Sequence, residues 1–155
     1  MSEGQRLLAG AYRIGQDILV HPVAFTQDGL GVNVPPVHHF PAHEDPAAIG
    51  AALRGVLFTP PSIVPPRGWK ERAPLGKQFL KAARVASWRQ LQLKALSCWI
   101  TVDGDVVKLT PLRNGGSRGD TKGFQPFGVP DIIVDAAASD EALGAALIEA
   151  LRRSE

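Results

Sequence analysis

Ile49-Gly50-Ala51-Ala52-Leu53 and Leu143-Gly144-Ala145-Ala146-Leu147 are two copies of one pattern, and they decide the fold that we predict. At an offset of 94 residues, positions 42–57 and 136–151 share seven identities in sixteen. Internal similarity at a fixed spacing indicates a repeated structural unit. In both copies the apolar residues recur at i, i+3, i+4, i+7 and i+8, which predicts two amphipathic helices.

Both predicted helices have a marked N-terminus. Asp45 can accept hydrogen bonds from free backbone N–H groups, and Pro46 suits the first helical position. Ser139 can act in the same way ahead of Asp140 and Glu141, whose charges favour the first turn. The two helices therefore begin at equivalent places in the repeat.

Each helix also carries a glycine at the same position, Gly50 or Gly144. A glycine inside a helix costs about 1 kcal/mol relative to alanine. We therefore expect another element to pack closely there, and a sheet is the expected neighbour. The open alternative is that Gly-Ala-Ala is ordinary helix filler in an alanine-rich chain.

Strands are predicted on both sides of a central connection. Asp28-Gly29 and Asp103-Gly104-Asp105 are turn signals, and the second, between two apolar runs, predicts a tight hairpin. The predicted strands cover residues 11–14, 17–22, 31–34, 96–102, 106–110 and 131–134. They suggest two units that each run from strands through a loop to a helix.

The connection between the two units contains two kinds of segment. Residues 60–69 are rich in proline, which predicts an extended and stiff stretch. A helix is predicted at 76–86, and Ser87 can begin a second short helix. The sequence thus predicts a single α+β domain in which helices pack an antiparallel-rich sheet, with an internal duplication. Its half-repeats span about 11–57 and 96–151, joined by the proline-rich linker and helical segment at 58–95.

The composition fits one domain of ordinary size, because 155 residues with 45% hydrophobic residues can bury a real core. No apolar run has the length of a signal peptide or approaches the roughly 20 residues of a membrane span. We therefore expect a cytoplasmic protein without membrane contact. Cys98, the single cysteine, lies in an apolar segment and is expected to be a buried, inert thiol.

The charge is unevenly distributed along the chain. Residues 67–94 contain eight basic residues and one acid, whereas the flanking segments together sum to −5. This asymmetry indicates either a nucleic-acid-binding face or a solvated helix surface, and the sequence leaves both interpretations open.

The residues that could form a catalytic or metal site do not make a convincing pattern. His21, His38, His39 and His43 have no cysteine partner, and His38 and His39 should point to opposite faces of an extended segment. The glycine-rich loop at 113–123 is not followed by Gly-Lys-Ser/Thr at the spacing of a phosphate-binding loop. We expect no metal, no cofactor and no enzymatic activity; a small enzyme that uses the histidines is the weaker alternative.

A series of short motifs of apolar and small residues runs through the second half. They are Leu93-Lys94-Ala95-Leu96-Ser97-Cys98-Trp99-Ile100, then Gly104, Val107, Leu109 and Pro111, Lys122-Gly123-Phe124, Asp131-Ile132-Ile133-Val134, Ser139-Asp140-Glu141-Ala142-Leu143-Gly144-Ala145-Ala146-Leu147 and Ala150-Leu151. In these motifs the chain resembles the C-terminal half of the CdiI family, the immunity proteins of bacterial contact-dependent growth inhibition. Val20-His21-Pro22 and Ile49-Gly50-Ala51-Ala52-Leu53-Arg54 are similar to the first half of that family. The histidine-rich segment 38–43 and the loop 113–123 depart from it.

The resemblance implies a binding function. Such proteins neutralise the toxic C-terminal domain of a cognate effector, often a nuclease, inside the cell that makes them, and no catalytic residue carries over. It implies a one-to-one complex with that toxin domain. The rival interpretation is a small nucleic-acid-binding module that uses the basic segment 67–94, with Trp69 and Trp88 as stacking surfaces.

Variable loops on a rigid scaffold are the expected place for contacts with a specific partner. Because arginine and tryptophan are enriched at interface hot spots, the expected toxin-binding residues are Trp69, Arg113, Arg118, Asp120 and Lys122. For a nuclease with a basic cleft, the acids Asp28, Glu44, Asp120 and Asp131 could supply the complementary field, and the segment 67–94 would face away.

Overall fold

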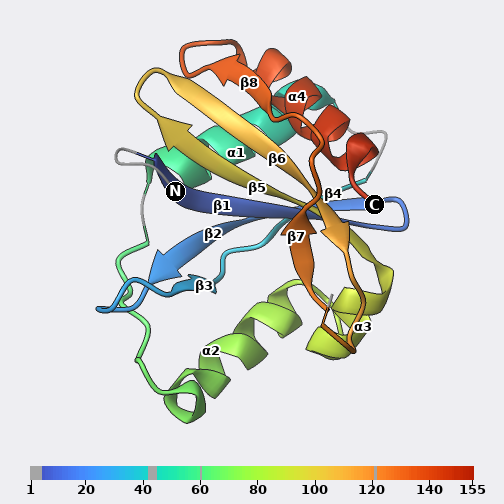
Figure 1. The fold of residues 1–155 in the computed structure, drawn as a ribbon. Helices are drawn as coiled ribbons and strands as arrows, with labels where there is room; N and C mark the ends of the chain where they lie inside the picture. The colour runs from blue at the N-terminus through green and yellow to red at the C-terminus, as the bar shows by residue number, and fades with distance from the viewer. Residues whose placement is uncertain (1–4, 42–44, 60, 121) are drawn as a thin grey trace.

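Antiparallel strands and four helices make up the computed structural model, which describes residues 5–41, 45–59, 61–120 and 122–155 (Figure 1). Within these residues the strands form one eight-stranded, curled sheet. The elements are β1 (Gln5–Ile14), β2 (Asp17–Phe25), β3 (Gly31–Asn33), β4 (His38–Pro41), α1 (Pro46–Phe58), α2 (Trp69–Ala82), α3 (Trp88–Lys94), β5 (Ala95–Asp103), β6 (Val106–Asn114), β7 (Phe124–Pro126), β8 (Ile132–Asp135) and α4 (Asp140–Arg153). The predicted α+β class with an antiparallel sheet is confirmed.

The two halves of the chain follow one pairing scheme. The sheet order is β3-β2-β1-β5-β6-β7, with β4 also paired to β2 and β8 also paired to β6. β1 and β5 pair antiparallel at the centre of the sheet. In each half the first strand pairs with the second, β1 with β2 and β5 with β6, and the second strand also pairs with two short strands. In both halves a helix follows the fourth strand.

The spacing between equivalent elements changes along the chain. β2 and β6 begin at Asp17 and Val106, 89 residues apart, whereas β4 and β8 begin at His38 and Ile132, 94 residues apart. Both hairpin turns place a glycine at positive φ, 59° at Gly15 and 58° at Gly104. The common scheme is what a duplicated unit would produce, and duplication of an ancestral half stays our prediction.

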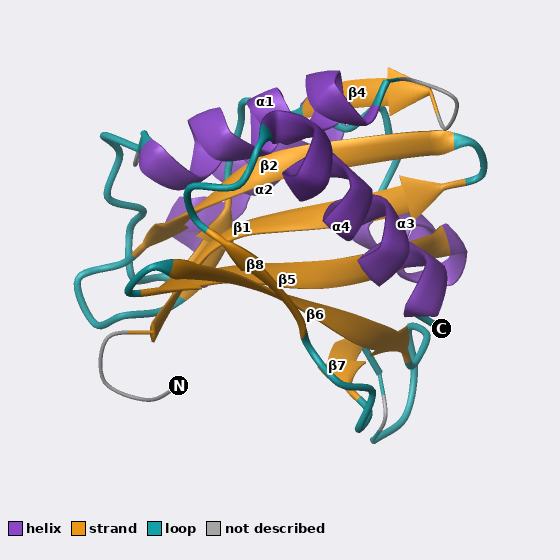
Figure 2. Ribbon diagram, turned by 90° about the horizontal axis from the view of Figure 1, so that it is seen from above, coloured by secondary structure: helices purple, strands orange, loops and turns teal. Residues whose placement is uncertain are grey.

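α1 and α4 lie side by side on one face of the sheet, as Figure 2 shows. Both apolar stripes predicted from the sequence are buried against the strands: Ile49, Leu53, Leu147 and Leu151 are at most 1% exposed. They pack with Ala11, Val20, Cys98, Ile100, Val107 and Leu109 in the main hydrophobic core. The core assignment of both helices is therefore confirmed.

The two repeat glycines lie where α1 and α4 cross. A Cβ atom on Gly50 would lie 1.7 Å from the backbone oxygen of Asp140, and one on Gly144 would lie 1.8 Å from that of Pro46. The expected close neighbour is thus present, but the expectation of a sheet was wrong, since each helix packs against the backbone of the other. Sequence periodicity identifies a close contact without identifying the element that makes it.

Hydrogen bonds fix the ends of these helices and tie α1 to the segment before α4. Asp45 Oδ1 accepts from Ala47 N at 3.0 Å and Ser139 Oγ from Ala142 N at 3.1 Å, so both predicted caps are confirmed. From α1, the Arg54 guanidinium donates to Asp140 Oδ1 at 2.8 Å. It also donates to the carbonyl oxygens of Ala136, at 2.7 Å, and Ala138.

The structure differs from the predicted boundaries in the first strand and in the connection between the halves. β1 begins at Gln5, earlier than the predicted residue 11, because it pairs along its length with β5. α2 begins at Trp69, not at residue 76, and continues through Pro74, a residue that usually ends a helix. The short strands β4 and β7 were not predicted, because both end in proline and contain no β-branched residue, unlike the equally short β3 and β8.

We expect Gly50→Ala to lower the free energy of unfolding by about 1–3 kcal/mol, because its Cβ must push two backbones apart. Gly144→Ala should behave alike. Gly55→Ala in the same helix is the matched control: nothing lies within 4 Å of its Cβ, so it should stabilise by up to about 1 kcal/mol. Urea unfolding of the three variants measures the difference; equal effects at Gly50 and Gly55 would contradict the close crossing.

Candidate functional site

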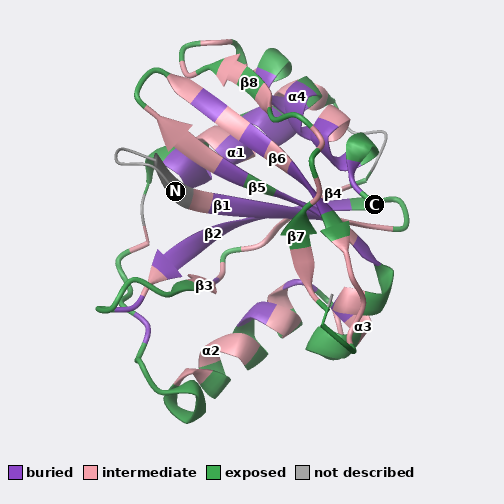
Figure 3. Cartoon of the chain, viewed as in Figure 1, coloured by how far each residue is buried: buried purple, intermediate pink, exposed green. Residues whose placement is uncertain are grey.

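The second face of the sheet is covered only in part. α2 and α3 lie below the sheet in Figure 1, on the side away from α1 and α4. They bury a smaller core over the first half of the sheet, made of Tyr12, Leu19, Phe79, Ala83, Leu91 and Ala95. The same face of β5, β6 and β8 has no helix on it among the described residues, and Figure 3 shows partly exposed stretches along these strands.

Strand alternation determines which side chains this uncovered face presents. Cys98 and Ile100 point into the main core, so Trp99 between them points to the other side. By the same rule Ile133 projects from β8, because Ile132 and Val134 pack against the core. Trp99 is 37% exposed and Ile133 60% exposed. The open sheet face, as we call it, consists of Trp99, Thr101, Lys108, Thr110, Asp131 and Ile133.

Polar contacts order the rest of the open sheet face. Lys108 Nζ lies 3.3 Å from Asp103 Oδ2, and Thr110 Oγ1 donates to Asp131 Oδ1 at 2.8 Å. Asp131 and Asp135 are exposed at its border. An apolar centre with hydrogen-bonded polar groups and acids around it resembles the centre and rim of a protein–protein interface.

The glycine-rich loop between β6 and β7 adjoins this face. Its neck is closed by backbone hydrogen bonds from Gly115 N to Gly123 O at 2.8 Å and from Gly123 N to Gly116 O at 2.9 Å. Trp99, Gly123 and Phe124 line one hollow of about 210 Å³ with residues of β1 and β2. At the tip of the loop the side chains of Arg118, Asp120 and Lys122 are exposed.

Arg113, at the end of β6, points away from the open sheet face. Its Nε lies 3.2 Å from Glu155 Oε2, and its guanidinium lies 5.0 Å from the centre of the Phe127 ring. Glu155 follows α4, so Arg113 belongs to the side of the sheet that α4 covers. Sequence reasoning assigned Arg113 to the loop because the predicted strand ended at residue 110, whereas β6 continues to Asn114.

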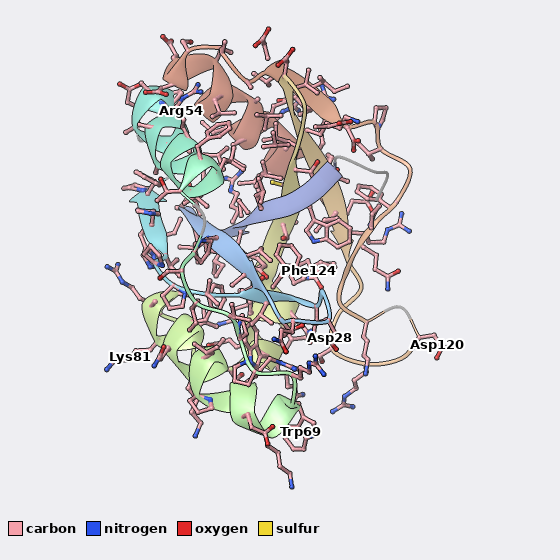
Figure 4. All side chains as sticks on the ribbon, turned by 90° about the vertical axis from the view of Figure 1, so that its left-hand side faces the viewer. Asp28, Arg54, Trp69, Lys81, Asp120 and Phe124 are labelled. Carbon is pink, nitrogen blue, oxygen red and sulfur yellow. The ribbon has the colours of Figure 1, made fainter. Side chains whose placement is uncertain are left out.

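Trp69 belongs to a separate site. It lies at the first position of α2, is 71% exposed, and lines a groove of about 660 Å³ between α2 and β3. Trp88 lines the same groove. In Figure 4 the labelled side chains of Trp69 and Asp120 project from different parts of the molecule.

The five predicted contact residues therefore do not form one surface. Arg118, Asp120 and Lys122 lie together at the loop, whereas Arg113 and Trp69 lie elsewhere. Sequence reasoning missed Trp99 and Ile133, although the alternation in residues 96–102 could have placed Trp99 opposite the core. Asp28 lies in the turn before β3, and Glu44 is outside the described residues.

The histidines that were considered as metal ligands are dispersed. His39 Nε2 donates to the carbonyl oxygen of Ala82 at 2.6 Å, on the α2 side of the sheet. His38 is its neighbour on β4 and, by alternation, points the other way, as predicted. His43 lies outside the described residues; among those described, no three metal-ligating side chains gather.

His21 is buried in the smaller core. Its ring lies 5.5 Å from Tyr12 and 4.9 Å from Phe79, measured between ring centres. Nδ1 donates to the carbonyl oxygen of Pro22 at 2.9 Å, which fixes a neutral tautomer. Burial lowers the pKa of His21 to about 4, and the bond to Pro22 offsets this only in part.

Two further groups are structural by their burial. Cys98 is completely buried, and burial raises the pKa of its thiol, which confirms the predicted inert cysteine. Burial also raises the pKa of Tyr12 to about 12, while the hydrogen bond from Asn33 Nδ2 at 3.0 Å acts in the opposite direction.

None of the helices in the described part of the chain combines the length and the hydrophobicity that a membrane span requires.

Comparison with known proteins identifies relatives of this fold. The sequence model of a family described as CDI immunity protein (CdiI) matches residues 33–154. None of the curated proteins matches the chain.

Two solved structures share the fold over almost the whole chain. A Neisseria meningitidis protein of unknown function is 16% identical, with a TM-score of 0.74; 100% of this chain and 99% of that chain are covered. A chain from a CdiA-CT/CdiI toxin and immunity complex of Yersinia pseudotuberculosis is 14% identical, with a TM-score of 0.72 and coverage of 96% and 97%. At these identities the likeness establishes the fold.

The burial of His21 predicts a pH dependence of stability. Histidine in the unfolded chain titrates near its ordinary pKa of 6.5, and between this value and about 4 the unfolded chain binds more protons than the folded protein. Stability is therefore fully present above about pH 6.5 and is lost as the pH falls toward 4.

Because of His21, we expect the free energy of unfolding of the wild type to fall by about 2 kcal/mol when the pH is lowered from 7 to 5. Urea unfolding of the wild type and of His21→Gln at both pH values isolates the contribution of His21, because all other titratable groups are common to both proteins. Equal losses in wild type and variant would contradict a buried, neutral His21.

Proposed function

The chain belongs to the CDI immunity protein family, and from this we propose that it binds and neutralises the toxic C-terminal domain of a cognate contact-dependent growth inhibition effector. The match over residues 33–154 is the observation that carries the proposal. The shared fold with a chain from a toxin and immunity complex supports it. The protein would act inside the cell that makes it, as a one-to-one inhibitor without turnover of its own.

The toxin would bind on the open sheet face and on the adjoining loop. Trp99 and Ile133 offer exposed apolar area on rigid strands, which is the kind of anchor that dominates interface energies. Arg118, Asp120 and Lys122 on the loop would then set the choice of partner, because loop residues can vary without disturbing the core. Both parts meet at the hollow lined by Trp99 and Gly123.

The charge of this surface bears on the nature of the toxin. Lys108 is paired with Asp103, and no ion pair among the described residues neutralises the exposed carboxylates of Asp131 and Asp135 at the border. At this acidic border a nuclease that binds an anionic substrate in a basic cleft would meet a complementary field, while Arg118 and Lys122 on the loop would contact other parts of the toxin. We propose a nuclease toxin on this ground.

We expect the protein to co-purify in equimolar amount with the C-terminal toxin domain encoded beside its gene, and to restore growth of cells that express that domain. Size-exclusion chromatography with light scattering measures the stoichiometry, and colony counts measure the rescue. Failure of both would refute the immunity function, whatever surface is involved.

Ile133→Lys tests the surface. Because Ile133 is 60% exposed, we expect normal folding, and a charge at the centre of a buried contact should weaken toxin binding by about 10-fold or more. Phe58→Lys on α1 is the matched control, since Phe58 is 51% exposed and α1 covers the opposite face of the sheet. Calorimetry with the purified toxin domain gives both affinities. Equal affinities for the two variants would show that the toxin binds another surface, without contradicting the immunity function.

A further inference from the structure

The basic segment 67–94 carries charges that form no ion pair in the part of the chain that the structure describes. Five ion pairs connect described residues, Arg54–Asp140, Lys108–Asp103, Arg113–Glu155, Arg152–Glu149 and Arg153–Glu149, and none involves a residue of 67–94. Seven of the eight basic residues in the segment are exposed, and Arg72 is half-buried. Such a concentration of one charge favours an anionic ligand.

These cations are ordered along α2. Lys70, Lys77 and Lys81 are spaced by seven and four residues, so they lie on one side of the helix. The helix has 14 residues and is therefore about 21 Å long. In Figure 4, Trp69 and Lys81 mark its two ends. The row is long enough to follow several phosphates of an extended strand.

The groove beside this row contains two tryptophans. Trp69 and Trp88 line the space of about 660 Å³ between α2 and β3, together with Leu30 and Leu80. Arg72 and Lys77 line it too, and no carboxylate does so among the described residues. Outside this lining, the hydrogen bond from Thr26 is the main cause that lowers the pKa of Asp28, and the nearby charges of Arg67 and Arg72 lower it further.

Trp88 is held flat against α2. Its ring stacks on Phe79 with an angle of 8° between the planes and 5.4 Å between the centres, and 41% of the residue stays exposed. The far face of a ring fixed in this way is a rigid platform. Trp69 is 71% exposed, and Lys70 Nζ lies 5.7 Å from the centre of its ring.

We propose that the groove between α2 and β3 binds single-stranded nucleic acid. The bases stack on Trp69 and Trp88, and the phosphates contact Arg72, Lys77 and the adjacent row of lysines. A positive groove combined with aromatic platforms is the common design of sites that bind single strands without reading their sequence. The site goes beyond toxin neutralisation and does not depend on it.

An acidic protein segment is the competing occupant. Its carboxylates would pair with the cations, but nothing in such a segment would stack specifically on the two tryptophan rings. A nucleic-acid strand satisfies both, because every base has a π-face and every linkage carries a charge. The groove adjoins the hollow at Trp99, because Asn33 lines both, and the substitutions that test the two sites therefore avoid Asn33.

The test uses the intact protein and a fluorescein-labelled oligouridine of about 12 nucleotides, measured by fluorescence anisotropy. We expect binding that weakens steeply with salt and that quenches tryptophan fluorescence. Trp69→Ala and Lys77→Glu should each weaken binding by about 10-fold, and Lys77→Glu should also reduce the salt dependence. Both side chains are exposed, so the fold should persist, as circular dichroism will verify.

Matched controls distinguish binding at the groove from non-specific attraction to the positive charge of the protein. Lys122→Glu makes the same charge change on the glycine-rich loop, outside the lining of the groove, and Phe58→Ala removes an aromatic ring that is exposed on α1. Both should bind the oligonucleotide within about twofold of the wild type. Absence of binding, or equal losses for Lys77→Glu and Lys122→Glu, would overturn the proposal. It would also be overturned if Trp69→Ala and Lys77→Glu weakened toxin binding while oligonucleotide binding stayed unchanged.

Discussion

The crossing of α1 and α4 at Gly50 and Gly144 is the constraint on which the arrangement of this protein depends. The Cβ atom that either glycine lacks would collide with the backbone of the opposite helix, so the two helices can pack this closely only without side chains there. The close pair fits onto one face of the sheet and buries the apolar side of β1, β2, β5 and β6. All remaining structure must then lie on the second face or at the edges.

The sequence predicted the features that local chemistry determines. The caps Asp45, Ser87 and Ser139 and the hairpin at Gly104 each depend on a few neighbouring residues, and all of them form. The repeat was readable only in the helices, because the spacing between equivalent strands is 89 residues in β2 and β6 but 94 in β4 and β8. β4 and β7 exist because β2 and β6 offer them pairing partners, which is tertiary information.

Contact residues are harder to predict than elements, because exposure can be estimated from residue type but adjacency cannot. Trp69 and the loop residue Asp120 were each plausible, and the fold places them at different sites. Trp99 shows the opposite error. Tryptophan in an apolar strand suggests core, yet its neighbours Cys98 and Ile100 occupy the core and leave its ring on the other face. Period-two alternation contained this information, and hydrophobicity alone concealed it.

The connection between the two halves, which contains α2 and α3, explains why the second face is asymmetric. The two halves share one strand scheme, so by symmetry both halves of the second face should look alike. α2 and α3 bury Tyr12 and Leu19 in the first half, and no described element buries Trp99 and Ile133 in the second. The same connection brings the positive charge of residues 67–94, which the net charge of +2 hides because the flanking segments are acidic. One segment thus produces two surfaces of different character: a cationic aromatic groove where it lies, and an acid-bordered apolar face where it is missing.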